Sequence, residues 1–112
     1  MPTVTITQLV PPTQLGNTDV SVYLTPNQTT IKIGRAVFTN NSASPTTITA
    51  GITTGGSLGP SNTFISAMPI APGAAYVSPE LAGAVLTQGE QLHAYAGAAN
   101  AVAFIVSGIT IV

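Results

Sequence analysis

The feature that most constrains this chain is a repeated alternation of apolar and polar residues with a period of two. Val20, Val22 and Leu24 occupy every second position and are followed by the turn-forming pair Pro26-Asn27. Similar stretches, rich in Thr, Val and Ile, recur between turn residues about every ten positions. Because β-branched side chains favour the pleated surface of a sheet, this pattern predicts an all-β fold. We expect a single-domain antiparallel β-sandwich or jelly roll of about eight short strands.

Glycines and the alternation predict finer features of these strands. Gly34 is expected to mark a β-bulge, and Gly108 is expected to separate the last short strand from the strand before it. Strict alternation places Met68 beside Phe64 on one face and Ile65 on the opposite face. The strands expected after the first one are 20–25, 31–38, 46–54, 64–70, 75–78, 92–96, 102–106 and 109–112.

A helical turn is expected near 79–86 and nowhere else in the chain. Ser78 is placed to cap the N-terminal end of this short helical segment. Glu80 lies close to the same end, near the positive end of the helix dipole. The preceding pair Pro72-Gly73 predicts a tight turn in which the glycine adopts a positive φ.

The first segment is predicted to be a strand or an extended arm. Val4 and Ile6 alternate with threonines until Pro11-Pro12, where the strand is expected to end. We therefore divide the chain into an N-terminal strand or arm, 1–12, and a β-sandwich domain, 13–112. A total of 112 residues is enough for one compact domain.

Charge is scarce, since only 4% of the residues are charged and the formal net charge is −1. Lys32 and Arg35 are the only cations, which is too few to neutralise a phosphate backbone, so nucleic acid is not expected as a partner. The uncharged tail 91–112 is interrupted by polar residues and glycines, so no membrane-spanning helix is expected either. The N-terminus lacks the pattern of a secretory signal, which predicts synthesis in a cytoplasm without export.

The chemistry-bearing residues form no recognisable catalytic or metal-binding constellation. The run GGSLG at 55–59 matches the nucleophile-elbow pattern, but it lies in a predicted glycine-rich loop between strands and not between a strand and a long helix. His93 is the sole histidine and has no second strong ligand beside it, so we expect it to be a surface or interface residue. Nothing in the spacing of Asp19 and Glu80 requires them to meet. We therefore expect no enzymatic activity, no catalytic or metal site, and no cofactor.

A surface built mainly from Thr, Ser, Asn, Gln, Gly and Ala favours dense association. Neutral surfaces approach each other without charge repulsion and without the desolvation cost of buried ions. The composition therefore predicts a protein that associates with copies of itself, as a dimer or trimer, and with a larger neighbour.

Several stretches resemble those of small β-sandwich structural proteins of tailed bacteriophages and prophages. They are VFTNNS at 37–42, FISAMPIAPG at 64–73, PELAGAVLTQGE at 79–90 and SGITI at 107–111. The resemblance covers about 31–112 and consists of turn and packing motifs. It implies a place in the virion, either as capsid decoration (cement) or as a head–tail, collar or tail-fibre accessory. It supplies no catalytic residue.

Our leading hypothesis is a cement protein on the outer surface of an icosahedral shell, where it bridges subunits of the major capsid protein. The N-terminal segment is expected to add a strand to a neighbour's sheet, although it fits equally well as the domain's own first strand. The two cations are expected to meet acidic capsid positions. The candidate interaction residues are Val4, Ile6, Leu9, Val10, Lys32 and Arg35.

An alternative hypothesis is a receptor- or glycan-binding module on a tail fibre. It requires a shallow polar and aromatic site, and the residues available for such a site are Tyr23, Tyr76, Tyr95 and His93.

Overall fold

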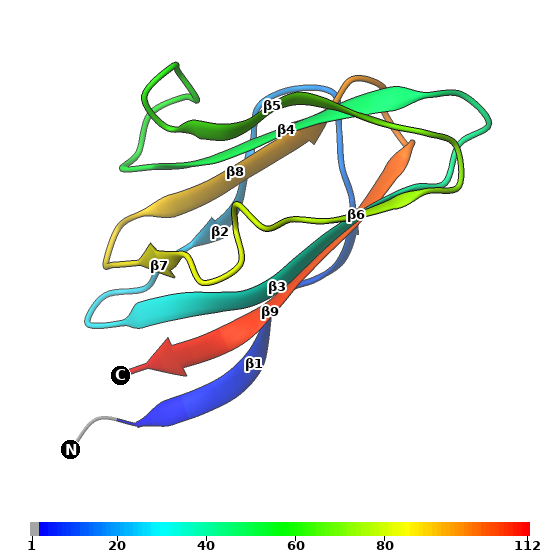
Figure 1. Cartoon of the computed structure of the whole chain (residues 1–112). Helices are drawn as coiled ribbons and strands as arrows, with labels where there is room; N and C mark the ends of the chain where they lie inside the picture. The colour runs from blue at the N-terminus through cyan, green and yellow to red at the C-terminus, as the bar shows by residue number, and fades with distance from the viewer. Residues whose placement is uncertain (1–2) are drawn as a thin grey trace.

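A computed structural model describes residues 3–112 and shows nine strands in two antiparallel sheets that pack face to face (Figure 1). This confirms the predicted all-β sandwich. Within the described residues, none form a helix long and apolar enough to cross a membrane. The strands are β1 (Val4–Gln14), β2 (Ser21–Leu24), β3 (Thr30–Asn40), β4 (Thr46–Thr53), β5 (Thr63–Ile70), β6 (Ala75–Val77), β7 (Val85–Leu86), β8 (Gln91–Ala96) and β9 (Val102–Ile111).

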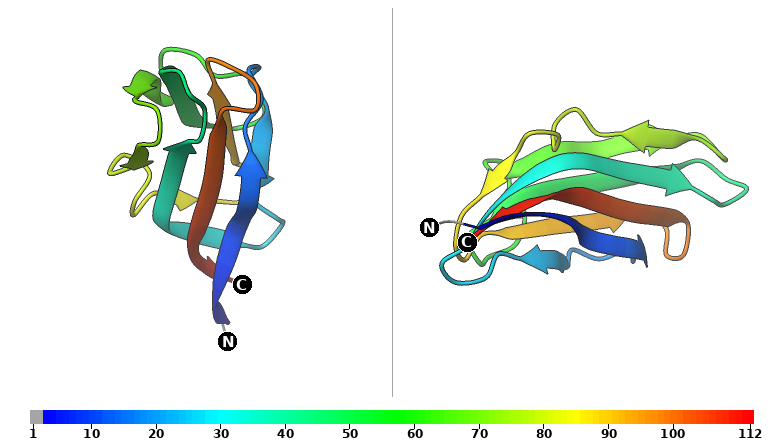
Figure 2. Two further views of the ribbon diagram at one scale, coloured as in Figure 1. Left: turned by 90° about the vertical axis from the view of Figure 1, so that its right-hand side faces the viewer. Right: turned by 90° about the horizontal axis from the view of Figure 1, so that it is seen from below.

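The two sheets differ in their order of strands. Sheet A has the order β1-β9-β3-β6, and β7 pairs with another part of β3. Sheet B has the order β2-β8-β4-β5. The long central strands β9 and β3 pair along almost their whole length, and Figure 2 shows the two layers from the side and from below. β1 therefore forms one edge of sheet A, and β5 forms one edge of sheet B.

The core fills the space between the two sheets. Phe38 and Phe104, which face each other across β3 and β9, stack with ring centroids 4.3 Å apart. Leu92, Ala94 and Ala96 reach the same core from β8, as their alternation predicts. The largest fully buried side chains are Phe38, Phe104, Leu15, Ile31, Ile33, Ile48, Ile65, Leu81, Leu86, Leu92, Val102 and Val106.

The first strand runs further than predicted. β1 continues through Pro11-Pro12 to Gln14 and pairs with β9, so the predicted end at the proline pair is wrong. An edge strand tolerates proline because one row of its N–H groups has no partner in the sheet. The register of β1 against β9 shifts on both sides of Val10, so the strand is bulged there. The predicted boundary at residue 12 falls inside this strand, and residues 1–2 of the predicted arm lie outside the described range.

Two glycines behave differently from each other. The register shift between Ile33 and Arg35 confirms the bulge predicted at Gly34. Gly108, in contrast, lies inside the continuous strand β9, so the predicted break there is wrong. A Cβ at this position would meet the backbone oxygen of Lys32 and would lie 3.1 Å from the backbone nitrogen of Gly34. Glycine is therefore used at Gly108 because the bulged strand β3 approaches β9 closely, and not to end the strand.

Strict alternation fails in β5. Ile65 is buried and Met68 also packs against the core, so the prediction that they face opposite sides is wrong. The register shifts between Ile48 and Ala50, and Ala67 adopts a positive φ of 48°. The hydroxyl of Thr49 accepts a hydrogen bond from the Ala67 backbone N–H (3.1 Å), which supports this irregular geometry. One extra residue at the bulge returns Met68 to the side of Ile65.

The predicted helical turn near 79–86 is limited to a single turn. The backbone N–H of Ala82 donates to the carbonyl of Ser78 (3.3 Å), and the hydroxyl of Ser78 accepts from the N–H of Leu81 (3.1 Å), as expected for a cap. Gly83 then takes a φ of 82°, and the chain enters the short strand β7. Pro72-Gly73 forms the expected turn, with a φ of 75° at the glycine.

Candidate functional site

The outward-facing side of sheet A is the most distinctive surface of the molecule. In β3, Ile31 and Ile33 point inward and are buried, whereas Lys32 between them is exposed. The strand register aligns Ile6 of β1, Ile109 of β9, Lys32 of β3 and Val85 of β7 in one row across the sheet. Ile6, at 87% the most exposed of the large apolar side chains in the described range 3–112, therefore lies on the same side of the sheet as a cation.

Apolar rows lie on both sides of this one. Val4 pairs with Ile111 near one end of the sheet, and Ile105, Val37 and Val77 form a row further along β9, β3 and β6. We call this surface the outer face of sheet A. Its apolar members are Val4, Ile6, Val37, Val77, Val85, Ile105, Ile109 and Ile111.

Both cations of the chain lie on the outer face of sheet A. The bulge at Gly34 sets Arg35 opposite the exposed Ser107, on the same side of the sheet as Lys32. None of the strands of sheet A contains Asp or Glu. The ion pair found within residues 3–112 joins Asp19 and His93 and involves neither cation. The outer face of sheet A is therefore apolar, positively charged and without an acidic partner of its own.

The structure separates the candidate interaction residues into two groups. Val4, Ile6, Lys32 and Arg35 lie on the outer face of sheet A. Leu9 and Val10 do not, since they are 8% and 2% exposed and belong to the core. The bulge between Gln8 and Val10 turns two consecutive side chains inward, which alternation alone does not predict. Leu9 and Val10 are thus unavailable to a partner while β1 remains paired in this way.

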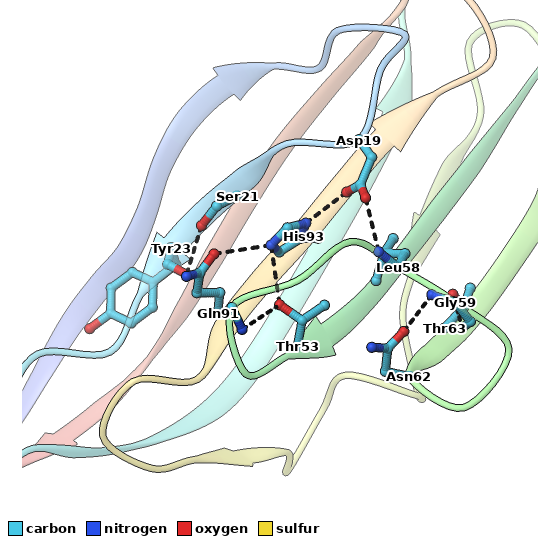
Figure 3. Close-up of polar contacts among 11 residues, drawn as sticks. Asp19, Ser21, Tyr23, Thr53, Leu58, Gly59, Asn62, Thr63, Gln91 and His93 are labelled. Atoms are coloured by element: carbon cyan, nitrogen blue, oxygen red, sulfur yellow. Dashed lines mark hydrogen bonds and ion pairs between the residues drawn. The ribbon is translucent and has the colours of Figure 1, made fainter.

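A cluster of polar side chains around His93 of β8, in sheet B, is a further candidate site, which the sequence did not predict (Figure 3). Nδ1 of His93 lies 2.7 Å from Oδ1 of Asp19, a residue of the loop between β1 and β2. Nε2 of His93 lies 3.1 Å from Oε1 of Gln91 and 3.3 Å from the hydroxyl of Thr53. His93 is only 7% exposed, so its predicted position at the surface is wrong. Asp19 and His93 are 74 residues apart in the chain, and no local pattern links them.

The loop between β4 and β5 covers this cluster. Oδ2 of Asp19 accepts a hydrogen bond of 2.9 Å from the backbone N–H of Leu58. Gly51 of β4 lies beneath the same loop, where a Cβ would meet the backbone oxygen of Asn62 and lie 2.7 Å from Leu58 Cδ2. The glycine-rich run 55–59 is thus part of a loop, as predicted, and this loop is held against sheet B.

Burial and hydrogen bonding act in opposite directions on Asp19. Partial burial raises the pKa of this carboxyl, but the hydrogen bonds from Leu58 and His93 and the charge of His93 outweigh it and lower the pKa below its ordinary value of 3.8. Asp19 is therefore ionised near neutral pH.

The order Asp19, His93, Thr53 has the form of a carboxylate, a base and a hydroxyl nucleophile. Thr53 is only 2% exposed, however, and its hydroxyl also accepts a hydrogen bond from the backbone N–H of Gly55 (3.4 Å). No pocket is found in the part of the chain that the structure describes, 3–112. The hydroxyl of Thr53 is thus buried and already hydrogen-bonded, and the contacts of this cluster hold the loop between β4 and β5 against sheet B.

The residues of the alternative polar and aromatic site do not come together. Tyr76 is on β6 in sheet A, where its hydroxyl donates to Oε1 of Glu80 (2.6 Å). Tyr23, His93 and Tyr95 belong to sheet B. Tyr76 therefore cannot complete a single shallow site with the other three.

We compared this chain with family models, with curated proteins and with solved structures. No family model, curated protein or solved structure matches this chain. The outer face of sheet A is therefore the candidate site, on the basis of its own residues.

Proposed function

We propose that this chain is a virion structural protein, a decoration (cement) protein that attaches to the outer surface of an icosahedral shell and bridges neighbouring capsid subunits. The observation that supports this best is the outer face of sheet A, where rows of exposed and half-buried apolar side chains lie on both sides of Lys32 and Arg35. The similarity of the turn and packing motifs to small phage structural proteins supports the same role. The proposed location is the capsid surface, after synthesis in the host cytoplasm.

The outer face of sheet A has the properties of a protein-binding surface. Contiguous apolar side chains exposed on one face and bordered by polar residues are typical of interaction sites. Their burial contributes about 25 cal/mol per Å² of apolar area, and the cations select a partner surface that carries carboxylates. The major capsid protein is the proposed partner, and its contact region is expected to be apolar with acidic groups near Lys32 and Arg35.

Weak individual contacts are sufficient for this role. An interface of standard size buries about 1,600 Å², and such interfaces can be only micromolar in affinity. A protein that binds two neighbouring subunits at once gains effective concentration, so that its dissociation from the shell becomes far slower than from one subunit. Stability of the particle then increases because each copy links capsid subunits together.

The first test is the copy number in purified particles. Quantification of this chain against the major shell protein should give a ratio near one, and particles stripped of it should break at lower temperature or under milder osmotic shock. A few copies per particle would contradict the proposal and would indicate a neck, collar or fibre component.

The second test is rebinding to stripped particles. The double variant Lys32→Gln/Arg35→Gln should rebind about thirtyfold more weakly than wild type, because each of the two interfacial charge pairs contributes about 1 kcal/mol. Ser57→Glu/Ser61→Glu is the matched control, since it changes the net charge by the same amount on the exposed loop of sheet B. Equal rebinding of the two double variants would contradict a role for the outer face of sheet A.

A further inference from the structure

The free edge of β1 offers a second interaction surface. Thr3 and Val112 exchange both backbone hydrogen bonds, with N–H to carbonyl oxygen distances of 2.8 and 2.9 Å. In an antiparallel pair such hydrogen-bonded positions alternate with positions whose N–H and C=O groups point away from the partner. The register Val4 to Ile111 and Ile6 to Ile109 therefore directs the backbone groups of Val4, Ile6 and Gln8 away from β9. Among the described residues, no strand pairs with this side of β1.

The other strand edges of the molecule are poorly suited to pairing. β5 contains the bulge at Ala67 and the residue Pro69, neither of which continues a regular ladder. β2, β6 and β7 are only 4, 3 and 2 residues long. Edge strands are usually protected by charges, prolines, bulges or shortness. The stretch 4–8 of β1 has none of these, because it contains no charged residue and lies before the first register shift.

We propose that two copies of this chain pair through β1, antiparallel about a twofold axis, and join their A sheets into one continuous sheet. The axis passes beside Ile6, so that Ile6 of each copy lies opposite Ile6 of the other and Val4 lies opposite Gln8. This register uses every outward-pointing residue of the stretch 4–8, whereas a register centred on Thr5 or Thr7 leaves one of them unpaired. It also sets the two Ile6 side chains, each 87% exposed in the single chain, beside each other on the outer face of sheet A.

The symmetry has a consequence for docking, and only this consequence rests on the proposed function. A twofold axis perpendicular to the sheet leaves the outer face of sheet A of both copies on the same side of the dimer. Lys32 and Arg35 of both copies then point in one direction. The dimer presents two equivalent docking faces to a shell, as bridging requires.

A single engineered cysteine tests the register directly, because the natural chain contains none. Hydrogen-bonded antiparallel positions have Cα atoms about 5.5 Å apart, within the range of a disulfide. Under mild oxidation, Ile6→Cys should give a covalent dimer in a non-reducing gel. Val4→Cys alone should remain uncrosslinked, whereas a mixture of Val4→Cys and Gln8→Cys should form the disulfide. Crosslinking of Val4→Cys alone, or none with Ile6→Cys, would overturn this register.

Light scattering after size-exclusion chromatography tests the pairing itself. Wild type should have twice the mass of the 11.2 kDa chain. Ile6→Pro removes an outward N–H but none of the bonds to β9, so it should shift the protein to monomer while its circular dichroism spectrum is retained. Val85→Lys, on the same face but on the opposite side of sheet A from β1, should remain dimeric. A monomeric or trimeric wild type, or a dimer lost only in Val85→Lys, would refute edge pairing. Failure to rebind particles, with the dimer intact, would refute only the cement role.

Discussion

Replacing Gly108 with alanine should strongly destabilise the fold, because β9 and β3 approach each other closely at the bulge. The added Cβ would meet the backbone oxygen of Lys32 and would lie 3.0 Å from Leu9 Cδ1 and 3.1 Å from the backbone nitrogen of Gly34. Non-bonded carbon atoms pack at about 3.5–4.0 Å. Since two of these three neighbours are backbone atoms of a paired strand, rotation of a side chain cannot relieve the overlap. β3 and β9 must therefore move apart.

The expected cost lies at the upper end of the range for overpacking. Overpacking substitutions in a core typically lower the free energy of unfolding by about 1–3 kcal/mol. Because the clash here is with the backbone of β3, we expect a loss of about 3 kcal/mol. Alanine also restricts the unfolded chain more than glycine does, and this lower entropy of the unfolded state offsets less than about 1 kcal/mol of the loss. A loss of this size is a large part of the total stability of a small domain, which is about 5–15 kcal/mol. Thermal unfolding followed by circular dichroism should show Tm lower by roughly 10 °C.

Gly34→Ala is the matched control on the opposite side of the same bulge. A Cβ at Gly34 would lie 3.5 Å from the backbone oxygen of Ser107 and 3.7 Å from the Cα of Gly108, which are ordinary contacts. The φ of Gly34 is not in the left-handed region. This variant should remain within about 1 kcal/mol of wild type. Equal Tm values for Gly108→Ala and wild type would refute the reasoning from close strand approach, as would equal losses in the two variants.

Two further predictions concern the carboxylates. Because the pKa of Asp19 is lowered in the folded state, its stabilising contribution is complete above the unfolded pKa and is lost as the pH falls through the folded pKa. Asp19→Asn should lack this part of the acid destabilisation, so urea midpoints that fall in parallel for variant and wild type would contradict the prediction. Burial, together with the hydrogen bond to Glu80 and its charge, raises the pKa of Tyr76 from 10.0 to about 12. Glu80→Gln should lower this pKa towards its ordinary value in an ultraviolet titration of the tyrosines, and an unchanged titration curve would contradict the role of Glu80.

Local sequence patterns were sufficient to predict most of the sandwich. The alternation of Leu92, Ala94 and Ala96 corresponds to one buried face of β8, and the turn at Pro72-Gly73 has the expected positive φ. Such features depend on neighbouring residues in the chain, because side-chain alternation and φ preference are properties of short segments. The prediction of which side chains face the core failed where a bulge changed the period. This happened at Leu9 and Val10, where two consecutive residues are buried, and at Met68.

The residues of the candidate site were individually visible in the sequence, but their common surface was not. Lys32 and Ile6 share a row only because β9 lies between β1 and β3, and this order of strands is not encoded in any one segment. The same is true of Asp19 and His93, which meet through the packing of a loop on sheet B. Strand periodicity follows from local steric preferences, which can be derived from the chain alone. Strand order, bulge register and the direction of each exposed face depend on contacts between distant segments, and therefore only the folded structure establishes them.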